Sequence, residues 1–584
     1  MGIVEARFAS AGGCAIIGPM TANPVQRRFL RVGSRRVHYL RSGEGPPVVL
    51  IHSSPANTRL LEKDISRLSR DFTVFAFDTP GFGLSDPLPL ATMTVADLAD
   101  AMAQTMVAAG LPRCPVFGTH TGASIALEVG VRHPDRVTGL VLDGLAAFTA
   151  EECATLFGTY FRELPISDLG GHYSDTWTRF RDQSLWFPWT ARSPAALNDY
   201  DLSPPHSTHL WMQMYYEAVD SYEPAYRAAI FYGDVAIIAG VRSLSIPAVF
   251  CATETDMLHS HLDRLPPLGP DQQIVAIGSS TERKRELVAA SFARFGADGH
   301  APADRATIAS SATVDRQFVD GSAGQLHLRF AGDRVSPALL LIHDAPGSSE
   351  QAEPLIARLA ATHFVIAPDL PGHGESDAFA APPDLAAFAA ELLRLLDTLG
   401  IASAQLHGLG FGSSLALALA AEAPDRFTAL TLHGLPLPDA DERAAMLAHY
   451  APPIEIGPDG GHWYRTWLML RDSQLWFPWY DRRRDTLRRQ PADLSARRLH
   501  RWTIDVMRAR DTYAHLIHAA LAVDNEALLT ATRLPLTLVT DAANPLGHFD
   551  DRAATLRPDA VTPGHDAGLP VAADNRISVG SAQG

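Results

Sequence analysis

Residues 117–124 read FGTHTGAS, and the fold is decided by what lies on either side of them. The apolar run CPVFG at 114–118 leads into the stretch, and ASIALEVGVRHPDR at 123–136, which has the pattern of a helix, follows it. A buried strand, a tight glycine-flanked turn and a helix form the G-x-S-x-G turn that presents a catalytic nucleophile. The frame here is GTHTG at 118–122, so His120 stands where a serine is expected.

The composition is that of an ordinary globular protein. The chain has 584 residues, of which 46% are hydrophobic and 20% charged, and its net charge is −16. This charge argues against a nucleic acid partner, because phosphate binding needs a basic face. No apolar run is long enough to span a bilayer, and we identify no signal peptide, so we expect a cytoplasmic protein. The four cysteines show no metal or redox spacing.

The chain repeats once at an offset near 290 residues. Three pairs of segments carry the repeat: VVLIHSSPAN at 48–57 with LLLIHDAPGS at 339–348, FDTPGFGLSD at 77–86 with PDLPGHGESD at 368–377, and GGHYSDTWTRFRDQSLWFPW at 170–189 with GGHWYRTWLMLRDSQLWFPW at 460–479. A repeat of this length is a tandem duplication of a whole domain.

The repeat and the composition shifts predict the domain boundaries. We expect a first domain over 25–296 with a cap at about 150–230, a linker over 297–312, a second domain over 313–568 with a cap at about 440–520, and flexible segments over 1–24 and 569–584.

Inside each copy, short apolar runs alternate with helical patterns. In the first copy PVVLIH, TVFAFD, PVFGT and GLVLDG are candidate buried strands. The segment 94–110 predicts a helix with Thr94 as N-cap and Gly110 at its end. The opening RRFLRVGSRRVHYLRSG at 27–43 predicts an antiparallel hairpin at a sheet edge. Strands that alternate with helices indicate an α/β fold with a mostly parallel, doubly wound sheet.

Three motifs together resemble the α/β-hydrolase family: IHSSP after one strand, DTPGFGLSD after the next, and the glycine-flanked turn. The resemblance covers nearly all of both copies. It implies two tandem α/β-hydrolase domains, each with a helical cap insert.

The family's triad runs nucleophile, acid, histidine along the chain, and the first copy fills it only in part. His120 occupies the nucleophile position, and Asp256 fits the acid position. Ser279 stands where the histidine is expected, so we expect movement or water to bridge His120 and Asp256. Asp143 is a rival orienting acid, because some relatives place the acid after that strand.

His120 decides whether the first copy is an enzyme. The helix N-terminus disfavours imidazolium, so we expect a neutral ring that acts as base, nucleophile or hydrogen-bond donor. The family's oxyanion hole would come from the Thr121 backbone N–H and one N–H of the Ser53/Ser54 loop. The other interpretation is a tolerated polar residue in a decayed site.

The second copy lacks a nucleophile. Its turn places Gly410 at the apex, and the acid position falls on Asn544 or Asp541. His565 matches the histidine position, and His433 replaces the Asp143 of the first copy. We expect this copy to be degenerate and to support the first.

The cap segments repeat a second group of residues. His172, Trp177 and Arg181 recur as His462, Trp467 and Arg471. They form either cap packing or an aromatic-walled pocket in which Arg181 anchors a carboxylate or enolate. Similarity between the copies does not separate the two interpretations, since shared packing also survives duplication.

Together these patterns predict an atypical enzyme without metal or cofactor. It would hydrolyse, or cleave by base assistance, a small organic substrate in the first domain, against which the second domain packs. The alternatives are a non-catalytic pair that binds a ligand or partner, and a lyase or cofactor-free oxygenase. The sequence leaves the oligomeric state open.

Overall fold

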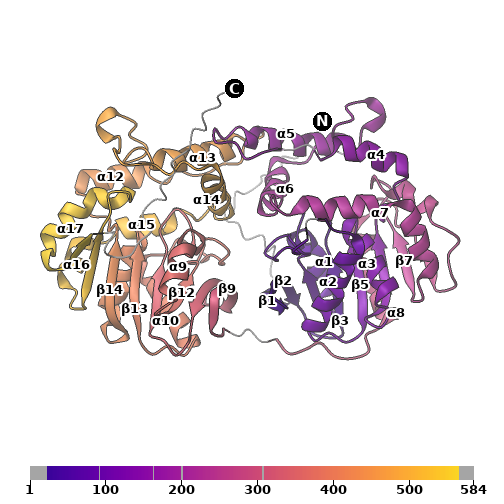
Figure 1. Ribbon diagram of the computed structural model, residues 1–584, viewed down its shortest axis with the longest axis horizontal. Helices are drawn as coiled ribbons and strands as arrows, with labels where there is room; N and C mark the ends of the chain where they lie inside the picture. Colours follow the sequence, from indigo (N-terminus) through magenta and orange to yellow (C-terminus); the bar gives the residue numbers. More distant parts are fainter. Residues whose placement is uncertain (1–22, 91, 162–163, 199–200, 305–307, 564–584) are drawn as a thin grey trace, which may run out of the picture.

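A computed structural model describes residues 23–563 except 91, 162–163, 199–200 and 305–307. These residues form two eight-stranded sheets, one in each copy (Figure 1). The first sheet has the order β1-β2-β4-β3-β5-β6-β7-β8. Its strands are β1 (Gln26–Val32), β2 (Arg35–Ser42), β3 (Pro47–Ile51), β4 (Thr73–Phe77), β5 (Cys114–Thr119), β6 (Val137–Asp143), β7 (Ala248–Cys251) and β8 (Gln272–Ile274).

The second sheet repeats this arrangement in the order β16-β15-β14-β13-β11-β12-β10-β9. Its strands are β9 (Ser311–Asp320), β10 (Gln325–Gly332), β11 (Ala338–Ile342), β12 (Phe364–Pro368), β13 (Ala404–Leu409), β14 (Phe427–His433), β15 (Leu536–Thr540) and β16 (Val561–Pro563). In both sheets the first two strands pair antiparallel and the central strands pair parallel. The predicted fold class and its duplication are confirmed.

Helices cover both faces of each sheet. In the first copy, one apolar cluster joins α1 (Glu62–Leu68) and α8 (Thr281–Phe295) to one face, and another joins α2 (Val95–Ala108) and α3 (Thr121–Arg132) to the opposite face. The second copy uses α9 (Glu353–Leu359), α10 (Leu385–Thr398), α11 (Gly412–Glu422) and α17 (Asp550–Leu556).

Two local predictions are confirmed. Helix α2 starts after Thr94, whose hydroxyl accepts the Asp97 N–H (3.2 Å) in a capping box, and Gly110 follows its end with φ of +69°. Strands β1 and β2 form the antiparallel hairpin, and β1 is the edge strand of its sheet.

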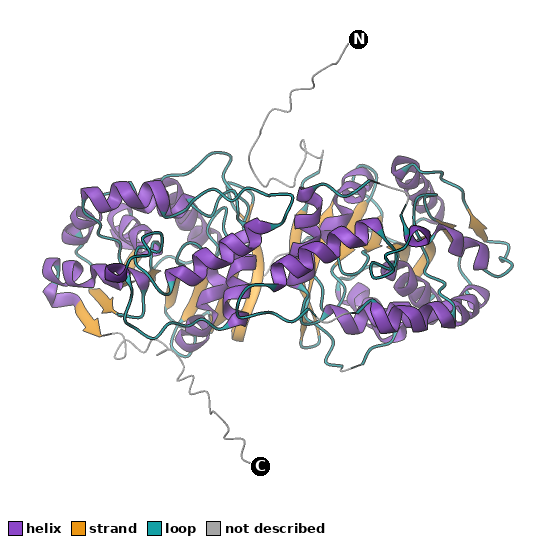
Figure 2. Cartoon of the chain, turned by 90° about the horizontal axis from the view of Figure 1, so that it is seen from above, coloured by secondary structure: helices purple, strands orange, loops and turns teal. Residues whose placement is uncertain are grey.

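The caps are helical insertions between the sixth and seventh strands of each sheet. The first contains α4 (Ala150–Thr159), α5 (His172–Leu185), α6 (Pro205–Glu217) and α7 (Tyr222–Ser243). The second contains α12 (Ala440–His449), α13 (Gly461–Ser473), α14 (Ala496–Arg508), α15 (His515–Leu521) and α16 (Asn525–Ala531). In Figure 1 they lie above the sheets, and α5 and α13 extend toward each other. Figure 2, seen from above, shows helices over this end of both sheets.

The two copies contact each other along the sheet edges and the caps. Edge strands β1 and β9 lie side by side, with Phe29 stacked on Phe318 (5.6 Å between ring centroids). Arg27 forms an ion pair with Asp377 of the second copy (2.7 Å), and its counterpart Arg316 donates to the Leu84 carbonyl of the first (3.0 Å). These reciprocal contacts cover the edge strands, which would otherwise expose unpaired backbone groups.

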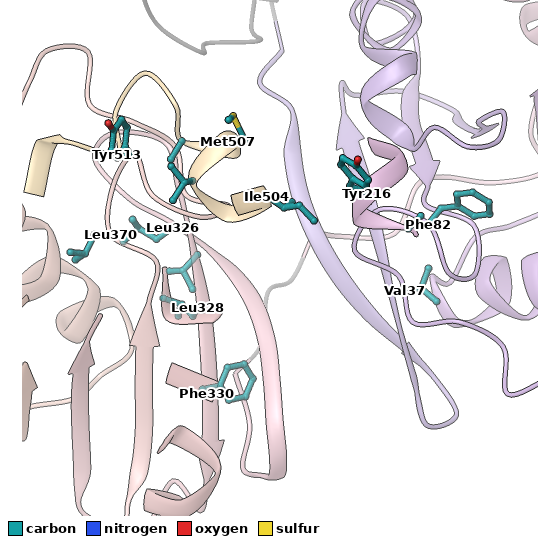
Figure 3. Packing of buried hydrophobic residues seen from close by; sticks show 14 of the residues in the cluster. Val37, Phe82, Tyr216, Leu326, Leu328, Phe330, Leu370, Ile504, Met507 and Tyr513 are labelled. Carbon is teal, nitrogen blue, oxygen red and sulfur yellow. The ribbon is translucent and has the colours of Figure 1, made fainter. Parts of the chain in front are cut away.

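One apolar cluster continues across this contact. It takes Val37, Phe82 and Tyr216 from the first copy and Ile504 and Met507 from the second (Figure 3). In the linker, Asp304 forms an ion pair with Arg28 (2.7 Å). The predicted flexible segments 1–24 and 569–584 fall outside the described residues, apart from 23 and 24.

Within the described part of the chain, no helix combines the length and the apolar character needed to cross a membrane.

Candidate active site

The turn between β5 and α3 holds His120 in a rare backbone conformation. Its φ is +49°, and among the described residues it alone has a positive φ without being glycine. Its N–H donates to the Asp143 carbonyl (2.8 Å). A Cβ on Gly118 would lie 2.1 Å from the Gly122 carbonyl oxygen, and one on Gly122 would lie 2.3 Å from the Ile51 oxygen. The two glycines therefore let strand and helix approach closely enough to present His120.

Asp256 contacts His120 directly. The Nε2–H of His120 donates to Asp256 Oδ2 (2.8 Å), while the Leu258 N–H donates to Oδ1 (2.9 Å). Neither movement nor water is needed to join the two side chains. Ser279 turns elsewhere, and its hydroxyl donates to Glu254 (3.3 Å).

Gly144 makes room for this pair. It follows β6 with φ of +66°, and a Cβ there would lie 2.6 Å from His120 Cδ2 and 2.9 Å from Nε2. A larger residue would occupy the path by which the ring reaches Asp256. The sequence shows this glycine in LVLDG, but only the folded chain places it against His120.

The pair shifts the pKa values of both members. The His120 side chain is 35% exposed and lines a small pocket. Desolvation there acts to lower its pKa, but the charge and hydrogen bond of Asp256 outweigh it, so the pKa is raised. Burial acts to raise the pKa of Asp256, but His120 and the Leu258 N–H bring it to about 2. The helix N-terminus was expected to lower the pKa of His120, whereas the contact with Asp256 raises it.

Asp143 is engaged elsewhere. Its Oδ2 accepts from Thr119 Oγ1 (3.0 Å) and from Lys284 Nζ (2.9 Å), and its side chain is buried. Lys284, on α8, is a neighbour that the sequence analysis did not assign to the site. Its charge acts to lower the pKa of His120 and so partly offsets Asp256.

The loop after β3 and the start of α3 meet at the expected oxyanion position. Ser54 N–H lies 3.4 Å from Thr121 Oγ1, and the buried Ser54 hydroxyl has no hydrogen-bond partner. Ser53 turns its carbonyl toward His52 Nδ1 (2.9 Å). Ser54 and Thr121 thus lie beside His120, and Ser53 supports the loop through its backbone.

A small pocket of about 40 Å³ opens on His120. Its walls are mostly apolar and come from the strand ends and the cap; they are formed by Ser54, His120, Thr121, Ala146, Phe148, Leu156, Tyr160, Phe187, Tyr226, Ala229, Ile230, Met257 and Leu258. The volume accommodates a few water-sized groups, so a larger ligand requires the cap to shift.

The second copy has filled the corresponding space. Gly410 has φ of +53°, and a Cβ on it would lie 1.9 Å from Asp344 Oδ1. The same oxygen accepts the backbone N–H of Phe411 (2.8 Å) and of Ala345 (2.7 Å), the positions that match Thr121 and Ser54. Burial raises the pKa of Asp344 to about 6 despite these bonds. A carboxylate of the chain itself therefore sits where an oxyanion would bind.

Phe411 is buried beside this carboxylate. Its ring lies edge-on to Tyr450 (5.4 Å between centroids), the counterpart of pocket residue Tyr160. In the first copy Thr121 occupies the place of Phe411 and leaves the pocket open. The sequence analysis did not consider Asp344 or Phe411, although both are visible when the copies are aligned.

A second histidine–aspartate pair lies in this closed copy. His433 Nε2 is 3.2 Å from Asp541 Oδ2. Asn544 occupies the place of Asp256 and accepts the Leu546 N–H (2.9 Å), as Asp256 accepts that of Leu258. His565 lies outside the described residues.

The repeated cap residues lie at the contact between the caps. His172 Nε2 is 3.0 Å from His500 Nδ1, and the matching pair, His209 Nδ1 and His462 Nε2, is also 3.0 Å apart. Trp177 donates to a second-copy carbonyl, that of Pro458 (3.1 Å).

Neither His172 nor Trp177 lines the pocket at His120, and Arg181 is exposed. Within the described residues, no three His, Cys, Asp or Glu side chains are grouped as a metal site requires.

Comparison with known proteins agrees with this architecture. The sequence profile of the α/β hydrolase fold family matches residues 46–240 and 337–452, one segment in each copy and together just over half of the chain. The chain therefore belongs to the α/β hydrolase fold family.

Individual relatives match shorter spans. The chain is 30% identical over 131 residues to haloalkane dehalogenase 2 of Mycobacterium tuberculosis, covering 22% of this chain and 46% of that protein. It is 31% identical over 146 residues to a proline iminopeptidase of Arabidopsis thaliana, covering 24% and 35%. The chain thus spans less than half the length of these relatives.

Among solved structures, an E-2-(acetamidomethylene)succinate hydrolase is 18% identical and covers 46% of this chain and 100% of its own, with a TM-score of 0.36.

Proposed function

We propose that the first copy is a cofactor-free enzyme that uses His120 and Asp256 to hydrolyse, or to cleave by base assistance, a small organic substrate. The observation that carries the proposal is the 2.8 Å hydrogen bond between the two side chains at the pocket. His120 stands where the family places its nucleophile, so the base itself occupies the apex of the turn. The second copy would be a non-catalytic support.

In this proposal each group has a task. Since Asp256 accepts the proton on Nε2, the lone pair of His120 lies on Nδ1 and can take a proton from water or from an acidic carbon of the substrate. Asp256 then stabilises the imidazolium. The backbone N–H groups of Thr121 and Ser54 would stabilise negative charge that develops on a carbonyl oxygen.

The second copy lacks both a base at the apex and a free oxyanion position. Gly410 offers no base, and the Asp344 carboxylate would repel an oxyanion at the Phe411 N–H. His433 has an acid partner, but the space that a substrate would need is occupied by the Phe411 ring.

The first test compares His120→Ala with His433→Ala on a panel of aryl esters and β-diketones. Loss of the base should reduce kcat/KM by ~10²–10⁴-fold. The matched change in the second copy should leave it unchanged. Equal turnover by wild type and a folded His120→Ala variant would remove His120 from the mechanism.

The pH profile tests the role of Asp256. A base must be deprotonated, so the rate should rise with pH through a pKa above the usual value of His, since Asp256 raises it. In Asp256→Asn the imidazolium loses its counter-charge, and the rising limb should move to lower pH while the maximal rate falls. If the rising part of the pH–rate profile is at the same pH in Asp256→Asn as in the wild type, a group other than His120 controls the rate.

A non-catalytic ligand-binding role is the second candidate. It is favoured by the turns themselves, which have no hydroxyl or thiol at the apex of either copy. This role predicts that no member of the panel is turned over, while compounds of the same size still raise the melting temperature.

A further inference from the structure

Arg179 is a buried charge without an acidic partner among the described residues. It lies on α5 of the first cap with 2% of its surface exposed. Its Nε, Nη1 and Nη2 atoms make no well-aligned hydrogen bond, although the Tyr215 hydroxyl interacts with the guanidinium, and within the described residues it forms no ion pair. Burial acts to lower the pKa of Arg179, but the surrounding tyrosines outweigh it and the pKa is raised, so the guanidinium stays charged although no carboxylate balances it.

The surroundings of Arg179 are aromatic rings and hydroxyl groups. Its guanidinium lies 4.9 Å from the ring centroid of Tyr215 and 5.8 Å from that of Trp189. Its electrostatic partners are the hydroxyls of four tyrosines: Tyr222, Tyr215, Tyr160 and Tyr226. Cation–π contacts compensate only part of the lost hydration.

Two of these tyrosines connect Arg179 to the pocket at His120. Tyr160 and Tyr226 both line that pocket, and their hydroxyl oxygens are 3.0 Å apart. In that bond one hydroxyl donates to the other, so one proton is left for an acceptor that enters the pocket, and the second becomes available when that acceptor replaces the bond between the two tyrosines. The positive charge of Arg179 near them favours an acceptor that carries negative charge.

Of the two copies, only the first combines the buried arginine with the tyrosine pair. Met469 stands in the place of Arg179 in the second copy, and Ile517 stands in the place of Tyr226. Met469 is buried like Arg179. The cap helix therefore packs without an arginine at this position, and packing alone does not account for the charge.

We propose that the pocket of the first copy binds a small carboxylate, which accepts hydrogen bonds from Tyr160 and Tyr226 and is balanced by Arg179. The inference names the substrate class of the site proposed above and rests on that proposal. The pocket of about 40 Å³ holds a group of acetate size without movement of the cap.

The test uses two pairs of ligands that match in shape and differ in charge: acetate with acetamide, and benzoate with benzamide. Binding to the full-length protein is measured by titration calorimetry and by the shift in melting temperature at constant ionic strength. At least one carboxylate should bind saturably and at least tenfold more tightly than its amide.

Three variants locate the effect. Arg179→Met, which installs the residue of the second copy, should weaken carboxylate binding at least tenfold and should not lower the melting temperature of the unliganded protein. Arg179→Lys should retain part of the preference. Arg181→Met, on the exposed face of the same helix, should bind as wild type does.

The outcomes separate this inference from the proposed function. His120→Ala should still bind the carboxylate even if turnover is lost. Equal binding of carboxylate and amide, binding of neither, or wild-type carboxylate binding by Arg179→Met would overturn the inference. A lower melting temperature of unliganded Arg179→Met would also overturn it, because the charge would then be structural.

Discussion

At the scale of single residues, the two copies differ in what occupies one point in space. In the first copy the apex carries His120, which turns to Asp256, and the nearby Ser54 N–H lies 3.4 Å from Thr121 Oγ1. In the second copy the apex is Gly410, and the carboxylate of Asp344 fills the space that glycine vacates. Asp344 lies on the loop after β11, not on the turn itself. Its carboxylate fits there only because Gly410 has no side chain.

Asp344→Asn should stabilise the protein above pH 6. The amide oxygen can keep both backbone hydrogen bonds, while the buried charge is removed. Because burial raises the pKa of Asp344 to about 6 in the folded state, the wild type loses stability as the pH rises from about 4 to 6. We expect a gain of roughly 1–2 kcal/mol at pH 8 and almost none at pH 4, measured by urea unfolding. A loss of stability at pH 8 would show that the carboxylate is needed.

At the scale of elements, the site depends on how closely β5, β6 and α3 approach. Gly118 and Gly122 bring α3 against the strand, and Gly144 clears the end of β6 so that the His120 ring can cross it. Helix α8 contributes Lys284, which holds Asp143 away from the ring. The hydrogen bond between His120 and Asp256 is therefore the product of several backbone positions.

Gly144→Ala tests this arrangement. Its Cβ would lie 2.6 Å from the His120 ring, so the ring should be displaced from Asp256 and turnover should fall at least tenfold. Gly400→Ala is the matched control, because its φ of +69° is similar but no atom lies within 4 Å of the new Cβ. Both variants should lose about 1 kcal/mol of stability from the strained backbone. Equal turnover in the two would show that Gly144 serves only the turn.

At the scale of the whole molecule, the copies share contacts that neither forms alone. Two buried histidine pairs join the caps, and Phe29 stacks on Phe318 between the sheets. Burial lowers the pKa of His172 to about 4, and burial with the neighbouring His172 lowers that of His500 to about 3. The caps therefore join through neutral rings.

The histidine pairs should make stability depend on pH. Because their folded pKa values lie below the unfolded value of about 6.5, the unfolded chain binds protons first, so stability falls as the pH drops from about 6.5 to 4. The double variant His172→Leu/His500→Leu should show a shallower fall, measured by thermal unfolding between pH 4 and 8. The exposed His300→Leu should keep the wild-type slope. An unchanged slope in the double variant would exclude the pair as its source.

The shared contacts also predict the behaviour of separated copies. If the chain is cut within 297–312, the first part loses the partners of Phe29, Tyr173 and Trp177 and exposes apolar surface. It should aggregate or melt at a lower temperature than the whole chain, measured by light scattering and calorimetry, and recover when mixed with the second part. A stable, soluble first part would mean that each copy folds independently.

The sequence alone determined the doubling, the mostly parallel sheets, the hairpin of the first copy, helix α2 and the position of His120 on its turn. These features depend on local periodicity, on turn glycines and on the repeat, all of which can be read along the chain. Asp256 was also within reach, because the resemblance to the α/β-hydrolase family assigns the acid to its position.

Only the tertiary structure decided which partners these residues take. The direct bond of His120 to Asp256 requires the space over Gly144, and the pairing of Asp143 with Lys284 requires α8 to lie beside β6. The cap helix shows the limit most clearly: the sequence favoured Arg181, whereas the fold exposes Arg181 and buries Arg179. Two positions correspond to about 200° on a helix, so Arg179 and Arg181 lie on nearly opposite faces of α5 and only one of them can be buried. Which face is buried depends on the contacts of α5 with α6 and with α13, and α13 lies nearly 290 residues away in the sequence.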